Sequence, residues 1–115
     1  MHRLVFMGSD PIALPALEWL RLHGSATAQV VGVFTQPDRP TGRGQRLTPN
    51  GIKLWAQEHG LPVFQPEKLT ASAREDLLAQ RPDAVLVMAY GHILRQDWLD
   101  LPPRGVWNLH ASVLP

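Results

Sequence analysis

The sequence predicts an α/β protein with a Rossmann-like, doubly wound and mostly parallel sheet that carries helices on both faces. Two observations predict this class. Short apolar runs rich in β-branched residues alternate with segments of helical periodicity, which is the order of parallel sheets covered by helices. Glycine and proline also separate most of these segments. Such folds bind ligands beyond the carboxyl ends of their strands, which places the expected site there.

Composition limits the class of protein further. The 115 residues are 44% hydrophobic and 18% charged, which suits one packed domain at most. There is no cysteine, so disulfides and thiolate metal sites are excluded, and no HxH or HExxH pattern suggests a metal. The apolar run Leu4–Met7 is too short for a signal peptide or a membrane span. We expect a soluble, cytoplasmic protein.

The first strand, turn and helix are predicted in that order. Arg3–Met7 is an apolar run of the kind buried in a parallel sheet. Ser9 or Asp10 then caps a helix that begins at Pro11, where proline's missing N–H is tolerated. Gly24 ends this helix. Its apolar face comprises Ala13, Leu14, Leu17, Trp19 and Leu20.

The next strand and a loop follow. Gln29–Phe34 is β-branched and free of charge, which predicts a strand. From Gln36 to Gly51 the sequence shows neither helical nor strand periodicity. Its three prolines and three glycines predict a loop. Between residues 35 and 53 four basic residues face one acidic residue, which suggests an anionic partner. Composition leaves two interpretations equal: the loop follows an RNA backbone, or it is flexible and its arginines only keep it soluble.

The second half of the chain predicts two helices and three strands. Helical periodicity predicts Ile52–His59, which Gly60 ends, and Ser72–Gln80. Three further segments are predicted as strands, of which the second gives the strongest signal of burial: Pro62–Phe64, Ala84–Ala89 and Gly105–His110.

Two of the predicted strand ends carry weak signals. The turn Gly8–Pro11 can present backbone N–H groups to an anion, but it is not a GxGxxG motif, so a plain capped turn is favoured. After the strongest strand, Tyr90 suits a core position, and Ile93 and Leu94 suit packing under the next loop. A lone histidine such as His92 is more often a surface residue than a catalyst.

The last strand end carries the most chemistry. Side chains alternate along a strand, so Asn108 and His110 point the same way, and Ser112 follows if the extension continues. An amide can donate to a developing oxyanion and an imidazole can move a proton, which suits a carbonyl reaction. Spacing alone slightly favours the alternative, a polar strand end with solvated groups.

Five segments, taken together, resemble one family. They occur in the order and spacing of the methionyl-tRNA formyltransferases, over essentially the whole chain. The QPDRPxGRG loop is the most specific element, because the related glycinamide ribonucleotide and sugar formyltransferases share NLHxSxLP but not this insertion. The segments are MGSDPIALPAL, VVGVFTQPDRPTGRGQRLTP, HGLPVFQPEKL, VLVMAYGHIL and GVWNLHASVLP.

The resemblance implies a reaction and its partners. The family transfers a formyl group from 10-formyltetrahydrofolate, a co-substrate, to the amino group of methionine on initiator tRNA. No metal, DNA or membrane is implied. Residues 1–115 would be the N-terminal part of the folate-binding formyltransferase domain. The rest of that domain, with a third catalytic residue (an aspartate), and a C-terminal RNA-binding domain would follow Pro115. The predicted sheet is therefore truncated, and the fragment is expected to be inactive alone.

The resemblance also assigns residues. The catalytic pair is Asn108 and His110. The folate-binding residues are Tyr90, Gly91, His92, Ile93, Leu94, Ser112, Leu114 and Pro115. The tRNA-binding residues are Gly8, Ser9, Arg39, Arg43 and Arg46. The family often has Thr-Pro-acidic-Phe where this chain has Ser-Asp-Pro-Ile at residues 9–12, but the glycine and the hydroxyl stay in place. Two other functions remain open: another folate-dependent formyltransferase, of the nucleotide-sugar or glycinamide ribonucleotide type, or a non-catalytic folate- or RNA-binding fragment.

Overall fold

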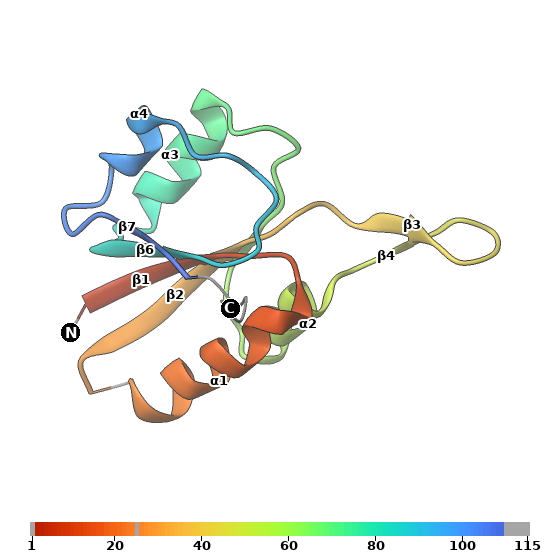
Figure 1. The fold of residues 1–115 in the computed structure, drawn as a ribbon, viewed down its shortest axis with the longest axis horizontal. Coiled ribbons are helices and arrows are strands. Elements are labelled where there is room, and N and C mark those ends of the chain that lie inside the picture. Colours follow the sequence, from red (N-terminus) through yellow and green to blue (C-terminus); the bar gives the residue numbers. More distant parts are fainter. Residues whose placement is uncertain (1, 25, 110–115) are drawn as a thin grey trace, which may run out of the picture.

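A five-stranded sheet forms the centre of the protein, in a computed structural model that describes residues 2–24 and 26–109. All neighbouring strands run parallel, in the order β5-β2-β1-β6-β7 (Figure 1). The predicted parallel sheet is therefore confirmed. The strands are β1 (His2–Met7), β2 (Ala28–Phe34), β5 (Val63–Phe64), β6 (Ala84–Val87) and β7 (Val106–Asn108).

Helices cover both faces of this sheet (Figure 1). Side chains alternate along β1, so Phe6 packs with Leu17 under α1 and α2, whereas Met7 packs with Leu77 under α3 and α4. Each face thus buries its own hydrophobic cluster, and the doubly wound arrangement is confirmed. The helices are η1 (Pro11–Ala13), α1 (Leu14–His23), α2 (Gly51–Glu58), α3 (Ala71–Ala79) and α4 (Gln96–Leu99).

The first helical segment begins and ends as predicted. Of the two candidate caps, Asp10 is the one used, because its carboxylate accepts a hydrogen bond from the Ile12 N–H at 2.9 Å. Pro11 is the first residue of η1, and Gly24 is the residue at which α1 ends. Ser9 does not cap this helix, and its contacts are described with the candidate active site.

The prediction of a loop throughout residues 36–51 is wrong. Two short strands, β3 (Arg39–Thr41) and β4 (Arg46–Thr48), pair antiparallel into a hairpin that projects from the body (Figure 1). Its turn uses Gly42 and Gly44 at φ +65° and +85°, values that favour glycine. Three-residue strands, one of them containing proline, are too short to show a period of two in the sequence.

Three other elements differ from the prediction. Trp19 was expected on the buried face of its helix, but it is 59% exposed and lies against the His23 ring. It sits about 200° around the helix from the buried Leu17, so both cannot face the sheet. The short helix α4 was not predicted, because one turn shows no period. The last strand is also shorter than the predicted Gly105–His110.

Candidate active site

The strand ends lie in one row at one edge of the sheet. Backbone registers place Phe34, Met7, Val87 and Asn108 side by side across β2, β1, β6 and β7. The segments that follow these strands therefore leave the sheet together. The sequence predicted this for the turns after β1, β6 and β7. It singled out residues 36–51 after β2 as a basic loop but did not place them at this edge.

The turn after β1 holds three of these segments together. The Gly8 N–H donates to the Phe34 carbonyl at 3.0 Å, and the Ser9 N–H donates to the Ala89 carbonyl at 2.9 Å. A Cβ on Gly8 would lie 2.6 Å from the Met88 carbonyl oxygen, so only glycine allows this approach. Gly8 and Ser9 thus have a structural role beside the RNA-binding one that the resemblance implies.

The segment after β6 divides its side chains between core and surface. Tyr90 is buried in the hydrophobic cluster beneath α3 and α4, as its core interpretation predicted. Leu94 is partly buried against the same cluster, whereas Ile93 is 90% exposed, so the expectation that it packs under a loop is wrong. Gly91 adopts φ +93°, which lets the chain turn back toward the surface.

The Tyr90 hydroxyl is buried without a hydrogen-bond partner among the described residues. Burial raises the pKa of this phenol above its usual range. Because an unsatisfied buried polar group costs about 1–3 kcal/mol, we expect Tyr90→Phe to be neutral or to raise the free energy of unfolding by about 1 kcal/mol. Urea unfolding at pH 7 measures this, and clear destabilisation would contradict it.

The same substitution is expected to change the response to alkaline pH. Above about pH 10 the unfolded phenol releases its proton, whereas the folded one retains it. The unfolded state then binds fewer protons, so stability falls as the pH rises. The Tyr90→Phe protein should lack this part of the fall. Tyr90 is the single tyrosine of these 115 residues, so phenolate absorbance identifies its titration directly.

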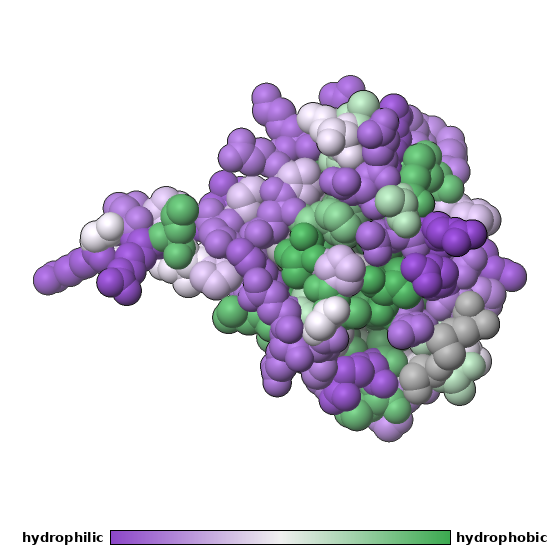
Figure 2. All heavy atoms as spheres, turned by 180° about the vertical axis from the view of Figure 1, so that it is seen from behind, coloured by the Kyte–Doolittle hydropathy of each residue, from purple (hydrophilic) through white to green (hydrophobic). Residues whose placement is uncertain are grey.

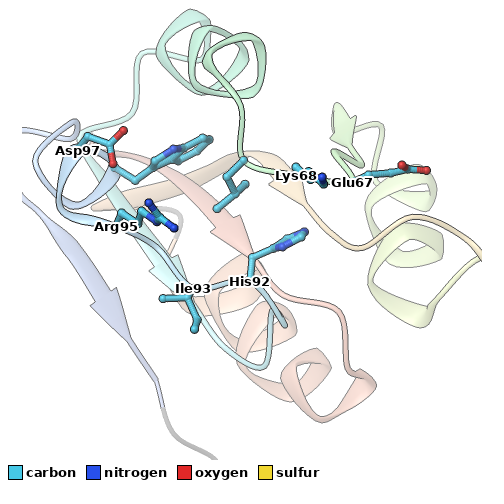
Figure 3. Close-up of a pocket in the computed structure, with 8 residues that line it drawn as sticks. Glu67, Lys68, His92, Ile93, Arg95 and Asp97 are labelled. Atoms are coloured by element: carbon cyan, nitrogen blue, oxygen red, sulfur yellow. The ribbon is translucent and has the colours of Figure 1, made fainter.

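A cleft of about 400 Å³ opens beside this segment (Figure 3). His92 and Ile93 line it on the side of β6, while Glu67 and Lys68 approach from the segment before α3 and Arg95 and Asp97 from the start of α4. His92 Nε2 lies 3.3 Å from the Pro66 carbonyl oxygen. The cleft therefore brings together two of the five predicted folate residues in the described chain, with polar side chains that the sequence did not single out.

The charges of the cleft are not balanced pair by pair. Asp97 is engaged by Arg74 at 2.9 Å, whereas Glu67, Lys68 and Arg95 form no ion pair within the described part of the chain. The cleft thus presents two positively charged groups, Lys68 and Arg95, and one carboxylate, Glu67, to a ligand. Arg95 directly follows the predicted folate segment, a position that could have suggested it. Lys68 lies within the segment HGLPVFQPEKL, but nothing in that segment pointed to a role for its lysine.

Asn108 is the last residue of β7 and is exposed at the common edge. Its neighbour Leu109 donates its N–H to the Val87 carbonyl at 2.7 Å, which keeps β7 paired with β6 up to this point. The amide side chain therefore stands at the end of a fixed strand. His110, Ser112, Leu114 and Pro115 lie outside the described residues.

The three predicted RNA-binding arginines lie along the hairpin. Residues 39–48 contain these arginines and no acidic residue. Arg43 occupies the turn between Gly42 and Gly44, at the far end from the body. Figure 2 shows the hairpin as a largely hydrophilic projection. At its root, Arg39 helps to line a second cleft of about 330 Å³ together with Ser9.

The acidic residue at the root of the hairpin is held on the body. Gln65 Nε2 donates to the Asp38 carboxylate at 2.8 Å, and Lys53 Nζ lies 3.0 Å from it. These two hydrogen bonds lower the pKa of the Asp38 carboxyl. The negative charge of Asp38 is therefore balanced by Lys53, so it does not offset the charge of the hairpin arginines.

The described residues contain neither a metal-binding cluster nor a membrane-spanning helix. In residues 2–24 and 26–109 no three histidine, cysteine, aspartate or glutamate side chains gather closely enough to hold a metal ion. No helix in the same ranges has the length and apolar character needed to cross a membrane.

A Rossmann-like sheet with its candidate site at the carboxyl edge defines a broad class of proteins. Comparison with known families identifies the family within that class. The chain belongs to the formyl transferase family, whose sequence model matches residues 2–115.

The particular relatives are methionyl-tRNA formyltransferases. The chain is 50% identical over 113 residues to that of Halorhodospira halophila, covering 98% of the chain and 36% of the relative. It is 47% identical over 114 residues to that of Trichlorobacter lovleyi, covering 98% and 35%. The chain thus spans about a third of the length of these relatives. The resemblance noted from the sequence motifs is confirmed.

Solved structures agree on the fold. Glycinamide ribonucleotide transformylase 1 from Symbiobacterium toebii matches with a TM-score of 0.70 at 21% identity, over 100% of this chain and 54% of that one. Phosphoribosylglycinamide formyltransferase from Brucella melitensis matches with a TM-score of 0.64 at 22% identity, over 99% and 59%. At these identities the likeness concerns the fold alone.

Proposed function

We propose that the full-length protein is a cytoplasmic enzyme that transfers a formyl group from 10-formyltetrahydrofolate to the amino group of initiator methionyl-tRNA. The identity of about half the residues to methionyl-tRNA formyltransferases carries this proposal, because it extends over 98% of the chain and so includes the arginine hairpin. Identity to the two solved glycinamide ribonucleotide enzymes is less than half as high.

The proposed chemistry is an acyl transfer at the carboxyl edge of the sheet. The neutral methionyl amine attacks the formyl carbon, so a new C–N bond forms and negative charge develops on the formyl oxygen. The Asn108 amide and a protonated His110 donate hydrogen bonds to that oxygen. The bond to the folate nitrogen then breaks. The amine loses one proton and the leaving nitrogen gains one, which His110 supplies directly or through water. No metal takes part in this scheme.

We propose that the 400 Å³ cleft receives the folate co-substrate. His92 and Ile93, which line it, belong to the segment that the resemblance assigns to folate. Tyr90 is buried beneath the segment and Gly91 sets its turn, and neither residue lines the cleft. Lys68 and Arg95 add the positive charge that suits the carboxylates of a folate, since charge-assisted hydrogen bonds are the stronger ones. Ser112, Leu114 and Pro115 remain proposed folate contacts.

The hairpin is proposed to contact the RNA, through Arg43 at the turn and Arg39 and Arg46 on its strands. Gly8 and Ser9 remain proposed neighbours of the aminoacyl end. Long-range attraction between arginine and phosphate explains why a projecting segment with three positive charges and no acidic residue would serve this purpose.

We expect Arg43→Ala in the full-length protein to weaken the use of methionyl-tRNA while folate binding stays nearly unchanged. The plot of log affinity against log salt concentration should become less steep, by about one unit of slope or less, because one phosphate contact is lost. Arg43→Lys should restore binding only in part, since an ammonium lacks the planar fork of a guanidinium. Fluorescence titrations with RNA and with folate at several salt concentrations measure these effects.

Arg21→Ala is a matched control for this experiment. It also removes an exposed arginine, one that pairs with Glu18 in the last turns of α1, away from the strand ends. It should leave RNA affinity unchanged. Equal losses of folate and RNA binding in Arg43→Ala would instead assign that arginine to the stability of the fold.

The proposal itself is tested by the acceptor that the full-length protein prefers. With 10-formyltetrahydrofolate as donor, initial rates are compared for initiator methionyl-tRNA, glycinamide ribonucleotide and an amino-sugar nucleotide. Formylation of methionyl-tRNA should exceed the other two. Preference for either small acceptor would establish another folate-dependent formyltransferase, and no transfer to any of the three would leave a folate- or RNA-binding protein.

A further inference from the structure

Gln36, the second residue after β2, uses all of its polar groups inside the site. Its N–H donates to Ser9 Oγ at 3.0 Å, and its carbonyl accepts from Gln65 Nε2 at 3.1 Å. Its side-chain Oε1 accepts from Arg39 Nη2 at 2.8 Å, and its Nε2 donates at 3.3 Å to the Tyr90 carbonyl, which also accepts a shorter hydrogen bond from Ser9 Oγ at 2.8 Å. One residue thus joins the turn after β1, the hairpin and the segment after β6.

The chemistry of the neighbours fixes the orientation of this amide. A guanidinium can only donate and a backbone carbonyl can only accept, so Oε1 must face Arg39 and Nε2 must face Tyr90. Neither a carboxylate nor an apolar side chain of the same length satisfies both partners. The position therefore requires glutamine for this bridge.

The bridge is a direct hydrogen-bonded connection between the hairpin and the body. Within the part of the chain that the structure describes, the only hydrogen bond between residues 39–48 and the remaining residues joins Arg39 to Gln36. On the other side, the Tyr90 carbonyl begins the segment that lines the 400 Å³ cleft. Gly91 follows in a positive-φ conformation, where a Cβ would lie 2.9 Å from Gln36 Nε2.

We propose that Gln36 is a positioning residue that couples the two substrate sites, so that RNA on the hairpin and folate in the cleft bind cooperatively. This inference rests on the proposed function. RNA on the hairpin restricts Arg39, Arg39 orients the Gln36 amide, and the amide, together with Ser9 Oγ, holds the Tyr90 carbonyl at the start of the folate segment. Order imposed at one site is then already present when the second ligand arrives, which makes the coupling positive.

The test measures this coupling in the full-length protein. The dissociation constant of tetrahydrofolate, which lacks the formyl group and so prevents turnover, is measured alone and with saturating initiator methionyl-tRNA. We expect RNA to tighten folate binding by about fivefold or more, within the usual range for coupled sites. By linkage, folate must tighten RNA binding by the same factor, which checks the measurement internally.

Two variants break the bridge differently. Gln36→Met removes both side-chain bonds at similar length. Gln36→Glu keeps an acceptor for Arg39 but sets a carboxylate oxygen against the Tyr90 carbonyl oxygen. In both, the coupling factor should fall to about one, while each ligand bound alone changes less. Gln65→Met is the matched control, because it removes bonds to the Gln36 carbonyl and Asp38 but leaves the bridge intact. It should retain coupling.

Each outcome decides the inference. Undiminished coupling in Gln36→Glu or Gln36→Met, or equal loss in Gln65→Met, would overturn the role of the bridge. If Gln36→Met does not fold, Gln36→Glu alone decides it. A coupling factor of one in the wild-type protein, with both ligands shown to bind, would overturn the inference of cooperative binding but leave the proposed function standing. Absence of tetrahydrofolate binding in the wild type would overturn the proposed function itself.

Discussion

Residues 1–115 alone should transfer formyl groups to methionyl-tRNA at least about 10⁴-fold more slowly than the full-length protein. In the scheme proposed for the site, His110 is held and kept charged by an aspartate that the family resemblance places beyond residue 115. In a serine-protease triad, disabling the corresponding aspartate lowers kcat by about 10⁴. Initial formylation rates at equal enzyme concentration measure the effect.

The control for this comparison is the folded state of the shorter chain. Its circular dichroism should show the mixed helix and strand content of the sheet and its covering helices, so that inactivity is not mistaken for unfolding. A rate within tenfold of the full-length protein would show that residues 1–115 contain all the groups that the reaction needs.

Asn108→Ala in the full-length protein should lower kcat by about 10²–10³ and change KM little, the effect typical of one lost oxyanion donor. The amide is proposed to bind charge that exists only in the transition state, so its loss should not weaken substrate binding. His110→Ala should behave in the same way. Steady-state kinetics with varied methionyl-tRNA and folate separate the two parameters.

Asn108→Asp distinguishes hydrogen-bond donation from shape. The carboxylate has nearly the same size and position on β7 but cannot donate, and it repels a developing oxyanion. The Asn108→Asp protein should therefore have a kcat no higher than that of the alanine variant. If the carboxylate variant were active, or if alanine mainly raised KM, Asn108 would be assigned to positioning of the substrate.

The sheet could be predicted from the sequence because its physical cause is local. Strands buried on both faces are largely apolar, so the apolar runs within Arg3–Met7, Gln29–Phe34 and Ala84–Ala89 stand out from their surroundings. Their observed bounds differ by two residues or fewer. The direction of the chain in a parallel sheet then places the turns after these strands at one edge, which is why these turns could be expected to lie together.

The connections within that edge could not be predicted. Gln36 and Tyr90 lie 54 positions apart, and their contact involves a backbone carbonyl, which every residue possesses. Lys68 is likewise an ordinary surface residue until the fold places it opposite Arg95. The exposure of Ile93 depends on the positive φ of Gly91, which a glycine permits but does not impose. Such features arise only when distant segments meet.

The hairpin has a consequence for how this protein can change over evolutionary time. Neither hydrophobic cluster contains a residue between 36 and 50, so the free energy that holds the sheet together does not depend on the projecting strands. Mutations there can alter what the protein recognises without first passing through an unstable intermediate. Natural variation, or the grafting of a hairpin from another protein, can therefore change the proposed recognition surface while the scaffold stays constant.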